Sequence, residues 1–577
     1  MDNQQSYQPG TLRAALNYEP KELKFGTSGR RGPVVDLTQL EIYINATAEL
    51  EYLQSLSQID GGITKGDEFY YAYDLRPSST QYDSQQKGRG ELAQAIERAI
   101  VDAGMRAVNL GAICTPAVTF FALQHGCGSI MVTGSHIPFD RNGYKTNSSK
   151  GELLKKDEKP INDHVEVIRD RLYKQSFDQS LFGADGMFKT GHQELKPAVD
   201  TGRDFYLRRY ADFFKGEHLS GKRVVVYQHS AVARDMLVDI LRRFDAEVIP
   251  AGRSDTFVPI DTENIDDERL KVIQDLADEA IAKHGPIDAV VSCDGDSDRP
   301  LVLGVDNGKV KFFGGDLVGM VVAEYLGVDA VVVPISCNDA IDRGDLKNKL
   351  QPKTKIGSPY VIEGMQKAQV QGKQATCGWE ANGGFLVGSS ISKAGHNLAA
   401  LPTRDAFLPI LAVLFSSAQQ GLPVTGLFDK LPKRFSKAAL LTNFAREQSL
   451  KIVAGLSPTN TAIADVRFGT GVEATDIDGR KVDIDSATSD KLGTIRTDLA
   501  KYFTKDLGFG SIVGLNYIDG VRMYFDNGDV AHIRPSGNAD ELRIYAVADS
   551  QERANAIAKA GVDEPDGILR KLAGAYA

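Results

Sequence analysis

Cysteine is scarce and scattered in this chain of 577 residues. The five cysteines are Cys114, Cys127, Cys293, Cys337 and Cys377. The count is odd, and no two of them form a C-x-x-C pair. A disulfide framework or a zinc site needs clustered cysteines. The sequence therefore favours reduced, mostly buried thiols and a cytoplasmic protein.

Long apolar runs and blocks of positive charge are also lacking. The longest apolar run is 406–415, whereas a membrane-spanning helix needs about 20 residues. The first ten residues are polar and do not follow the pattern of a secretory signal. The net charge is −10, and no cluster of Lys or Arg stands out, which argues against bulk nucleic-acid or membrane binding. We expect small molecules as partners.

A strand–helix rhythm occurs three times along the chain. Continuous apolar strands are predicted at 223–227, 288–292 and 329–335, and helices such as 91–104 alternate with strands of this kind. Such runs are typical of buried, largely parallel sheets. The C-terminal part differs, because 520–537 alternates apolar and polar residues around an Asp-Asn-Gly turn, a hairpin pattern.

These patterns predict three related α/β domains with mixed, largely parallel sheets, followed by a smaller α+β domain. The predicted domains are 1–200, 201–311, 312–435 and 436–577. Two polar, weakly patterned stretches, 147–200 and 455–500, are interpreted as insertions or linkers.

The strongest chemical signal is the acidic segment DGDSDR at 294–299, directly after a predicted buried strand. Residues two apart in an extended loop project to the same side, so Asp294, Asp296 and Asp298 can converge. Carboxylate oxygens suit Mg²⁺, and an EF-hand would need a later Gly and Glu. A solvated acidic turn is the alternative. We favour Mg²⁺ because α/β sheets bind ligands at the carboxyl ends of strands.

Three further segments are suited to an anion or a sugar. RPSGNADELR (534–543) can surround a phosphate, although a plain hairpin turn fits equally well. FGTSGRRG (25–32) is glycine-rich and offers Arg31, but it matches no nucleotide-binding fingerprint. In CGWEANGGF (377–385), Glu380 and Asn382 suit neighbouring sugar hydroxyls, although composition alone would favour a turn with a packed tryptophan.

Ser135 lies in TGSHIP (133–138), at the end of a predicted strand, and Gly134 is expected to let the backbone turn sharply there. The segment lacks the G-x-S-x-G pattern of a hydrolase. A serine at a strand end is usually structural. Beside a Mg²⁺-ready loop and two phosphate candidates, however, a phosphoryl-carrying serine is the better interpretation.

These motifs occur in the order seen in the α-D-phosphohexomutases, the phosphomannomutases and phosphoglucomutases, and the chain resembles this family over nearly its whole length. The resemblance implies four domains around a central cleft, Mg²⁺, and a hexose 1,6-bisphosphate as intermediate and activator. It implies these roles: Ser135 as phosphoserine; Ser135, Asp294, Asp296 and Asp298 as metal ligands; Arg31 and Arg299 on the transferring phosphoryl group; Lys145 in proton transfer; Gly357 and Ser358 in sugar choice; Glu380 and Asn382 on sugar hydroxyls; Arg534, Ser536, Gly537 and Asn538 on the other phosphate.

Some positions depart from the family pattern. The serine loop is more commonly TASHNP, so Gly134 and Ile137 differ, and Gly384 stands where a histidine is usual. The activity expected from the resemblance is the interconversion of mannose 6-phosphate and mannose 1-phosphate. Glucose phosphates, or both sugars, are the alternatives, and a Mg²⁺-dependent sugar phosphatase comes after them. A non-catalytic binder would have no need of Ser135 and Lys145.

Overall fold

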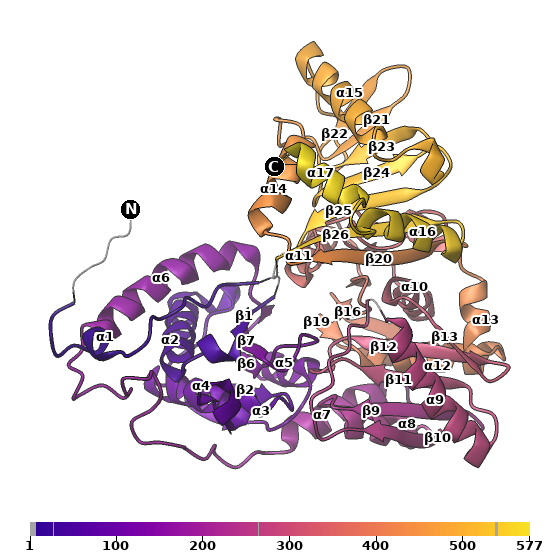
Figure 1. The fold of residues 1–577 in the computed structure, drawn as a ribbon. Helices are drawn as coiled ribbons and strands as arrows, with labels where there is room; N and C mark the ends of the chain where they lie inside the picture. Colours follow the sequence, from indigo (N-terminus) through magenta and orange to yellow (C-terminus); the bar gives the residue numbers. More distant parts are fainter. Residues whose placement is uncertain (1–6, 27, 264, 537–539, 577) are drawn as a thin grey trace. The chain divides into compact units, whose positions relative to one another are not determined.

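The computed structural model describes residues 7–26, 28–263, 265–536 and 540–576. The chain forms two compact units, one of Met1–Phe312 with Gly384–Thr425 and the other of Phe313–Gly383 with Gly426–Ala577. Strands and helices alternate in both units, so the predicted α/β class is confirmed (Figure 1). The four domain ranges stay a prediction.

The first sheet of the first unit has the strand order β1-β7-β6-β2-β5, with β8 paired to β7. The strands of this sheet are β1 (Arg30–Pro33), β2 (Glu68–Tyr73), β5 (Arg106–Asn109), β6 (Ser129–Val132), β7 (Arg141–Ser148) and β8 (Gly151–Glu152). The helices in this part of the chain are α1 (Leu12–Ala15), α2 (Gln39–Ser55), α3 (Pro77–Thr80), α4 (Leu92–Asp102), α5 (Thr115–Gln124) and α6 (Lys155–Tyr173). A separate two-stranded sheet is formed by β3 (Tyr82–Asp83) and β4 (Arg89–Gly90). Strand β2 runs parallel to β5 and β6, and β7 runs antiparallel to β6 and β1. The serine segment joins β6 to β7, so it lies at the carboxyl end of a parallel strand.

The second sheet of this unit has the order β10-β9-β11-β12-β13. Its strands are β9 (Arg223–His229), β10 (Glu247–Arg253), β11 (Ala289–Cys293), β12 (Pro300–Asp306) and β13 (Lys309–Phe312). The helices in this part of the chain are α7 (Thr201–Phe213), α8 (Arg234–Arg243) and α9 (Asp267–His284). Strand β11 is buried along its whole length because its apolar residues are covered on both faces of the sheet. The acidic segment joins β11 to β12, at the carboxyl end of β11.

The segment 384–425 returns to the first unit and packs there. It contains β16 (Phe385–Val387), β17 (Ile391–Lys393), β18 (His396–Leu398), β19 (Leu401–Asp405) and α12 (Phe407–Gln420), and α13 (Val424–Asp429) begins at its end. The long apolar run of the sequence forms the start of α12, which is buried. The Tyr206 and Tyr210 hydroxyls of α7 donate to the buried carboxylate of Asp405, and these bonds fix β19.

In the second unit, β14 (Ala330–Val332) pairs in parallel with β15 (Thr376–Trp379), beside α10 (Gly315–Leu326) and α11 (Ser358–Val370). A larger sheet has the order β20-β26-β25-β24-β23-β21-β22. Its strands are β20 (Phe435–Thr442), β21 (Asp465–Phe468), β22 (Val472–Thr475), β23 (Ile512–Asn516), β24 (Val521–Phe525), β25 (Val530–Pro535) and β26 (Glu541–Ala548). The helices in this part of the chain are α14 (Arg446–Gly455), α15 (Ser486–Ala500), α16 (Gln551–Val562) and α17 (Ile568–Tyr576). Strands β24 and β25 form the predicted hairpin.

Both stretches interpreted as insertions or linkers carry secondary structure. The stretch 147–200 contains α6, which packs on α2. The stretch 455–500 contributes β21 and β22 to the edge of the large sheet and includes α15, of which only three residues are buried. Few buried positions leave a weak apolar pattern in the sequence, and this explains the difference.

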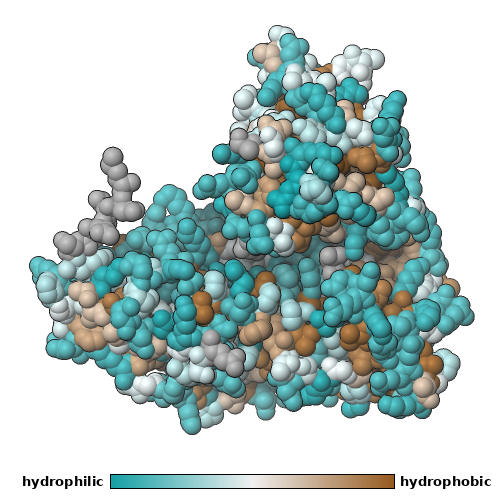
Figure 2. Space-filling model, in the orientation of Figure 1, coloured by the Kyte–Doolittle hydropathy of each residue, from teal (hydrophilic) through white to brown (hydrophobic). Residues whose placement is uncertain are grey.

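Polar residues cover most of the face drawn in Figure 2, and the apolar residues there form separate patches. Among the residues that the structure describes, no helix is both long and apolar enough to span a bilayer.

Candidate metal and phosphoryl-transfer site

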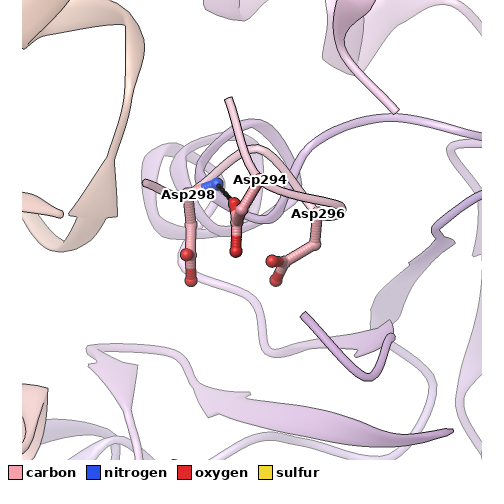
Figure 3. A group of neighbouring side chains, drawn as sticks. All are labelled: Asp294, Asp296 and Asp298. Atoms are coloured by element: carbon pink, nitrogen blue, oxygen red, sulfur yellow. Dashed lines mark hydrogen bonds between the residues drawn. The ribbon is translucent and has the colours of Figure 1, made fainter. Parts of the chain in front are cut away.

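The three aspartates of the acidic segment converge. Asp294, Asp296 and Asp298 are all 0% exposed, and each offers one carboxylate oxygen within 4.8 Å of the others. Figure 3 shows the three side chains extending to the same side of the turn. The turn is held by its own backbone, because Asp294 Oδ1 accepts hydrogen bonds from the N–H groups of Asp298 and Arg299.

The donors around the aspartates leave particular oxygens for a cation. Asp296 Oδ2 accepts from Thr115 Oγ1 and from Lys145 Nζ, each at 2.6 Å. Asp298 Oδ2 accepts from Lys145 Nζ at 2.6 Å and from Arg404 Nε at 3.0 Å. The Oδ1 atoms of both aspartates are buried without a hydrogen-bond partner among the described residues. Buried charged oxygens are costly without a partner, and hard oxygen ligands suit Mg²⁺. The site therefore fits a divalent cation.

Ser135 touches this site. Its Oγ donates to Asp294 Oδ2 at 2.9 Å, and the side chain is fully buried. Its backbone has φ 58°, an uncommon conformation for a residue with a side chain, and its N–H donates to Thr133 Oγ1 at 2.7 Å. The structure thus brings the predicted serine and the predicted metal loop together, although 159 residues separate Ser135 from Asp294 along the chain.

The charges of the three carboxylates differ with their surroundings. Burial raises the pKa of Asp294 well above its usual value, and the charges of Asp296 and Asp298 raise it further. Burial alone would also raise the pKa of Asp296 and of Asp298, but neighbouring positive charges outweigh this effect. The ammonium of Lys145 holds the pKa of Asp296 below its usual range. The pKa of Asp298 is lowered chiefly by the guanidinium of Arg404. Without a cation, three adjacent carboxylates cannot all ionise freely.

Two arginines that the sequence predicted to bind a phosphoryl group lie near the three aspartates. Arg31, on β1, has Nε and Nη2 buried without a hydrogen-bond partner among the described residues, and Arg299 has Nε in that state. Arg299 Nε lies 3.9 Å from Asp294 and 3.7 Å from Asp298. Burial lowers the pKa of Arg31 to about 10; the charge of Asp296 opposes this shift, whereas Arg299 and Arg404 add to it. Buried guanidinium donors of this kind fit an oxyanion such as phosphate.

The remaining predicted site residues belong to the second unit. Glu380 and Asn382 follow β15 directly and are 4% and 6% exposed. Gly357 has φ 133° and precedes α11, and Ser358 is the first residue of that helix.

The predicted phosphate loop follows β25 in the same unit. Arg534 Nε lies 3.1 Å from Asp519 Oδ1, and the backbone N–H of Ser536 donates to Glu541 O. Gly537 and Asn538 lie outside the described residues.

Sequence reasoning missed three residues at the site. Thr115 begins α5, Arg404 lies on β19, and Arg76 donates from Nη2 to the carbonyl of Ser135 at 2.9 Å. None of them belongs to a motif. A threonine at a predicted helix start is a weak signal, because such residues usually serve the helix itself.

Comparisons with known proteins agree on one family. Models of the phosphoglucomutase/phosphomannomutase domains match residues 22–171 (domain I), 314–435 (domain III) and 489–564 (C-terminal domain). The chain is 32% identical over 541 residues to a phosphomannomutase of Sinorhizobium fredii, covering 93% of this chain and 98% of that protein. It is 34% identical over 535 residues to a phosphomannomutase of Salmonella muenchen, covering 92% and 93%.

Solved structures show a similar fold. A putative phosphomannomutase of Thermus thermophilus has a TM-score of 0.59 at 18% identity, with 93% of this chain and 98% of that chain covered. A phosphoglucomutase-related phosphoprotein of Paramecium, in its open form, has a TM-score of 0.55 at 16% identity, with 96% of each chain covered.

Proposed function

The chain belongs to the phosphoglucomutase/phosphomannomutase family, the α-D-phosphohexomutases, and from this premise we propose that it interconverts mannose 6-phosphate and mannose 1-phosphate. The observation that carries the proposal is the 2.9 Å hydrogen bond from Ser135 Oγ to Asp294 Oδ2. Asp294 belongs to a group of three buried carboxylates that could bind a metal ion. Mannose is favoured over glucose because two relatives that align over more than nine-tenths of the chain are phosphomannomutases.

The proposed cycle transfers a phosphoryl group twice. In the first transfer, the bond between phosphorus and Ser135 Oγ breaks while a bond to the free sugar hydroxyl forms, which gives a hexose 1,6-bisphosphate. In the second, the other phosphate returns to Ser135 and the isomeric monophosphate leaves. Splitting the reaction in this way needs an oxygen nucleophile next to a cluster of charge-stabilising groups, and Ser135 stands next to one.

Four oxygen donors would hold Mg²⁺: a phosphoserine oxygen on Ser135, Asp294 Oδ2, Asp296 Oδ1 and Asp298 Oδ1. When bound, the cation would offset negative charge on the transferring phosphoryl oxygens. Thr115 and Lys145 hold the opposite oxygen of Asp296, and this contact orients the carboxylate.

Proton transfer is assigned to Lys145. Its Nζ lies 2.6 Å from both Asp296 and Asp298, so the side chain lies against the carboxylates that would hold the cation. We propose that Lys145 in its neutral amine form accepts the proton of the attacking sugar hydroxyl and, as the ammonium, returns a proton to the departing sugar oxygen in the second transfer. Arg31 and Arg299 would bind the phosphoryl oxygens, because their buried donors need an anion.

The substrate contacts of the second unit are also proposals. Glu380 and Asn382 would bind the sugar hydroxyls, and Gly357 and Ser358 would help to choose the sugar. Arg534, Ser536, Gly537 and Asn538 would bind the phosphate that is not reacting. A cytoplasmic location is proposed as well, because none of the five cysteines, all within the described residues, forms a disulfide bond.

Phosphorus NMR tests the proposal. The protein is supplied with Mg²⁺, a trace of hexose 1,6-bisphosphate, and either mannose 1-phosphate or glucose 1-phosphate. We expect the hexose 6-phosphate to accumulate without release of inorganic phosphate. The accumulation should be faster with mannose 1-phosphate than with glucose 1-phosphate. Ser135→Ala should abolish it, whereas Ser449→Ala, a change at another fully buried serine, should retain it. Release of inorganic phosphate instead would identify a phosphatase and contradict the proposal.

A further inference from the structure

A buried aspartate lies beside the serine loop, residues 133–138. Asp74 directly follows β2, and its side chain is 0% exposed. Strand β2 runs parallel to β6, and the N–H of Asp74 donates to the carbonyl of Val132, the last residue of β6, at 3.0 Å. The carboxyl ends of parallel strands meet at one edge of a sheet. Asp74 therefore lies next to the segment that begins at Thr133 and carries Ser135.

Both oxygens of the Asp74 carboxylate are occupied, each by two donors. Oδ1 accepts from the backbone N–H of Arg76 at 3.0 Å and from Ser79 Oγ at 2.7 Å. Oδ2 accepts from Arg76 Nη1 at 2.5 Å and from Thr133 Oγ1 at 2.8 Å. A fully buried carboxylate with four donors has no oxygen left for a substrate. Asp74 therefore acts on its neighbours.

Two of these neighbours continue to the backbone of Ser135. Thr133 Oγ1, which donates its proton to Asp74, accepts the N–H of Ser135 at 2.7 Å. Arg76 Nη2 donates to the carbonyl of Ser135 at 2.9 Å and also to the carbonyl of Ile137. Through one intermediate side chain on each side, a single carboxylate thus holds both the N–H and the C=O of Ser135.

The backbone of Ser135 is strained and needs such support. Its φ is 58°, in the left-handed region that residues with a side chain seldom adopt. Conformations of this kind persist only where the surrounding structure enforces them, and they cluster at functional sites. This conformation accompanies the placement of Ser135 Oγ at 2.9 Å from Asp294 Oδ2. Without the two backbone contacts, Ser135 should relax and its Oγ should move away from Asp294.

We propose that Asp74 is a positioning residue of the phosphoryl-transfer site. Its carboxylate sets, through Thr133 and Arg76, the backbone conformation that directs Ser135 Oγ to Asp294. The inference rests on the proposed function for the reaction that Ser135 performs.

Asp74→Asn tests this, because asparagine has the same shape but cannot reproduce the contacts. An amide has one oxygen and one NH₂ group, and the NH₂ group faces two donors whichever way the amide is turned. In either orientation, buried Arg76 also loses its negative partner. The kcat should fall about a hundredfold, as expected for a misplaced reacting group, and KM for mannose 1-phosphate should not change.

Hydrogen exchange followed by mass spectrometry gives a readout besides activity. In Asp74→Asn, the peptide that covers residues 133–138 should exchange faster than in the wild-type protein, because the N–H of Ser135 loses its fixed acceptor. Intact mass shows whether the compared samples carry equal amounts of phosphate. A loop that exchanges faster and a lower kcat at unchanged KM are the joint signature of a positioning residue.

Asp288→Asn is the matched control. Asp288 precedes β11, at the opposite end of that strand from the three aspartates, and its two oxygens accept from Lys222 Nζ and from the N–H of Arg223. This variant should keep the wild-type kcat and the wild-type exchange of residues 133–138, even where its melting temperature falls. A general loss of stability would therefore not imitate the effect expected for Asp74.

Wild-type exchange of residues 133–138 in Asp74→Asn would overturn the inference, and so would faster exchange with an unchanged kcat. If that peptide exchanges faster but the wild-type protein isomerises no hexose phosphate, Asp74 still positions Ser135 and only the proposed function fails.

A second variant covers the case in which Asp74→Asn does not fold. Thr133→Val keeps the shape of the side chain but removes the acceptor of the Ser135 N–H. It should lower kcat about tenfold, the effect expected for one buried hydrogen bond, and should speed the exchange of residues 133–138. Thr133→Ser keeps the hydroxyl and should behave like the wild-type protein. Wild-type kcat and exchange in Thr133→Val would contradict the inference.

Discussion

An alanine Cβ at residue 134 would lie 2.8 Å from Cζ of Arg76, because Arg76 is packed directly over Gly134. Arg76 cannot easily move away. Its Nη1 is paired with Asp74 at 2.5 Å, and its guanidinium lies 3.9 Å from the ring centre of Phe257. Since Nη2 of Arg76 also holds the carbonyl of Ser135, the position of the serine loop depends on this arginine.

Gly134→Ala is therefore expected to slow the mutase reaction by about tenfold or more. The added methyl group must displace Arg76 or shift the loop that carries Ser135, and overpacking of this kind costs about 1–3 kcal/mol. Turnover of mannose 1-phosphate and the melting temperature would be measured together. The control is Gly493→Ala, in α15, where an added Cβ meets no atom within 4 Å. A Gly134→Ala enzyme with the wild-type rate would show that Arg76 does not hold the loop.

Asp296→Asn and Asp298→Asn should each weaken Mn²⁺ binding by about a hundredfold. Each change removes a negative charge from a buried site whose unpaired Oδ1 atoms fit a cation. The measurement is the free Mn²⁺ signal in electron paramagnetic resonance. Asp275→Asn, at an exposed carboxylate paired with Lys271, is the matched control. Wild-type affinity in both site variants would place the cation elsewhere.

Thr115→Val should lower the turnover rate by about tenfold. The change keeps the shape of the side chain but removes the hydroxyl that donates to Asp296 Oδ2, and hydrogen bonds to charged groups contribute about 1.5–3 kcal/mol. Lys145 still holds that oxygen, so the loss should be partial. Thr115→Ser keeps the hydroxyl and should restore most of the rate. If serine and valine were equally harmful, the methyl group rather than the hydrogen bond would matter.

The predictable part of the site is the part that lies within short segments. Asp294, Asp296 and Asp298 share one loop, so their spacing alone predicted that they converge, and the structure brings them together. Arg404 and Thr115 reach the same carboxylates from strands and helices far away in the chain, and no spacing rule connects them. Only the packed fold shows such contacts.

Two glycines also show that contacts between distant segments cannot be predicted from the sequence. Gly134 was expected to let the backbone turn, but it is Ser135 that has the left-handed φ of 58°, and Gly134 instead makes room for Arg76. At Gly384, the sequence indicated only a missing histidine, whereas the structure places the stem of Arg404 against that position. A glycine required for space leaves no local pattern, because the atoms that need the space come from other segments.

Acid should destabilise the second unit through His532. This residue, on β25, is 0% exposed; its Nε2 hydrogen-bonds to the carbonyl of Asp519 at 2.6 Å, and its Nδ1 is buried without a partner among the described residues. Burial, helped by the positive charge of Arg522, lowers the pKa of His532 to about 3. The unfolded chain, with a histidine pKa of about 6.5, therefore binds a proton that the folded protein excludes.

The stability that His532 contributes is thus fully present above pH 6.5 and is lost as the pH falls toward 3. Between pH 6.5 and pH 5 the loss should be about 2 kcal/mol, since each pH unit below the unfolded pKa costs about 1.4 kcal/mol. Urea unfolding can be followed by the fluorescence of Trp379, the only tryptophan, which lies buried in the same unit. His532→Gln keeps an N–H donor but does not titrate, so its stability should fall about 2 kcal/mol less over that range. Parallel pH curves for the two proteins would mean that another group carries the acid sensitivity.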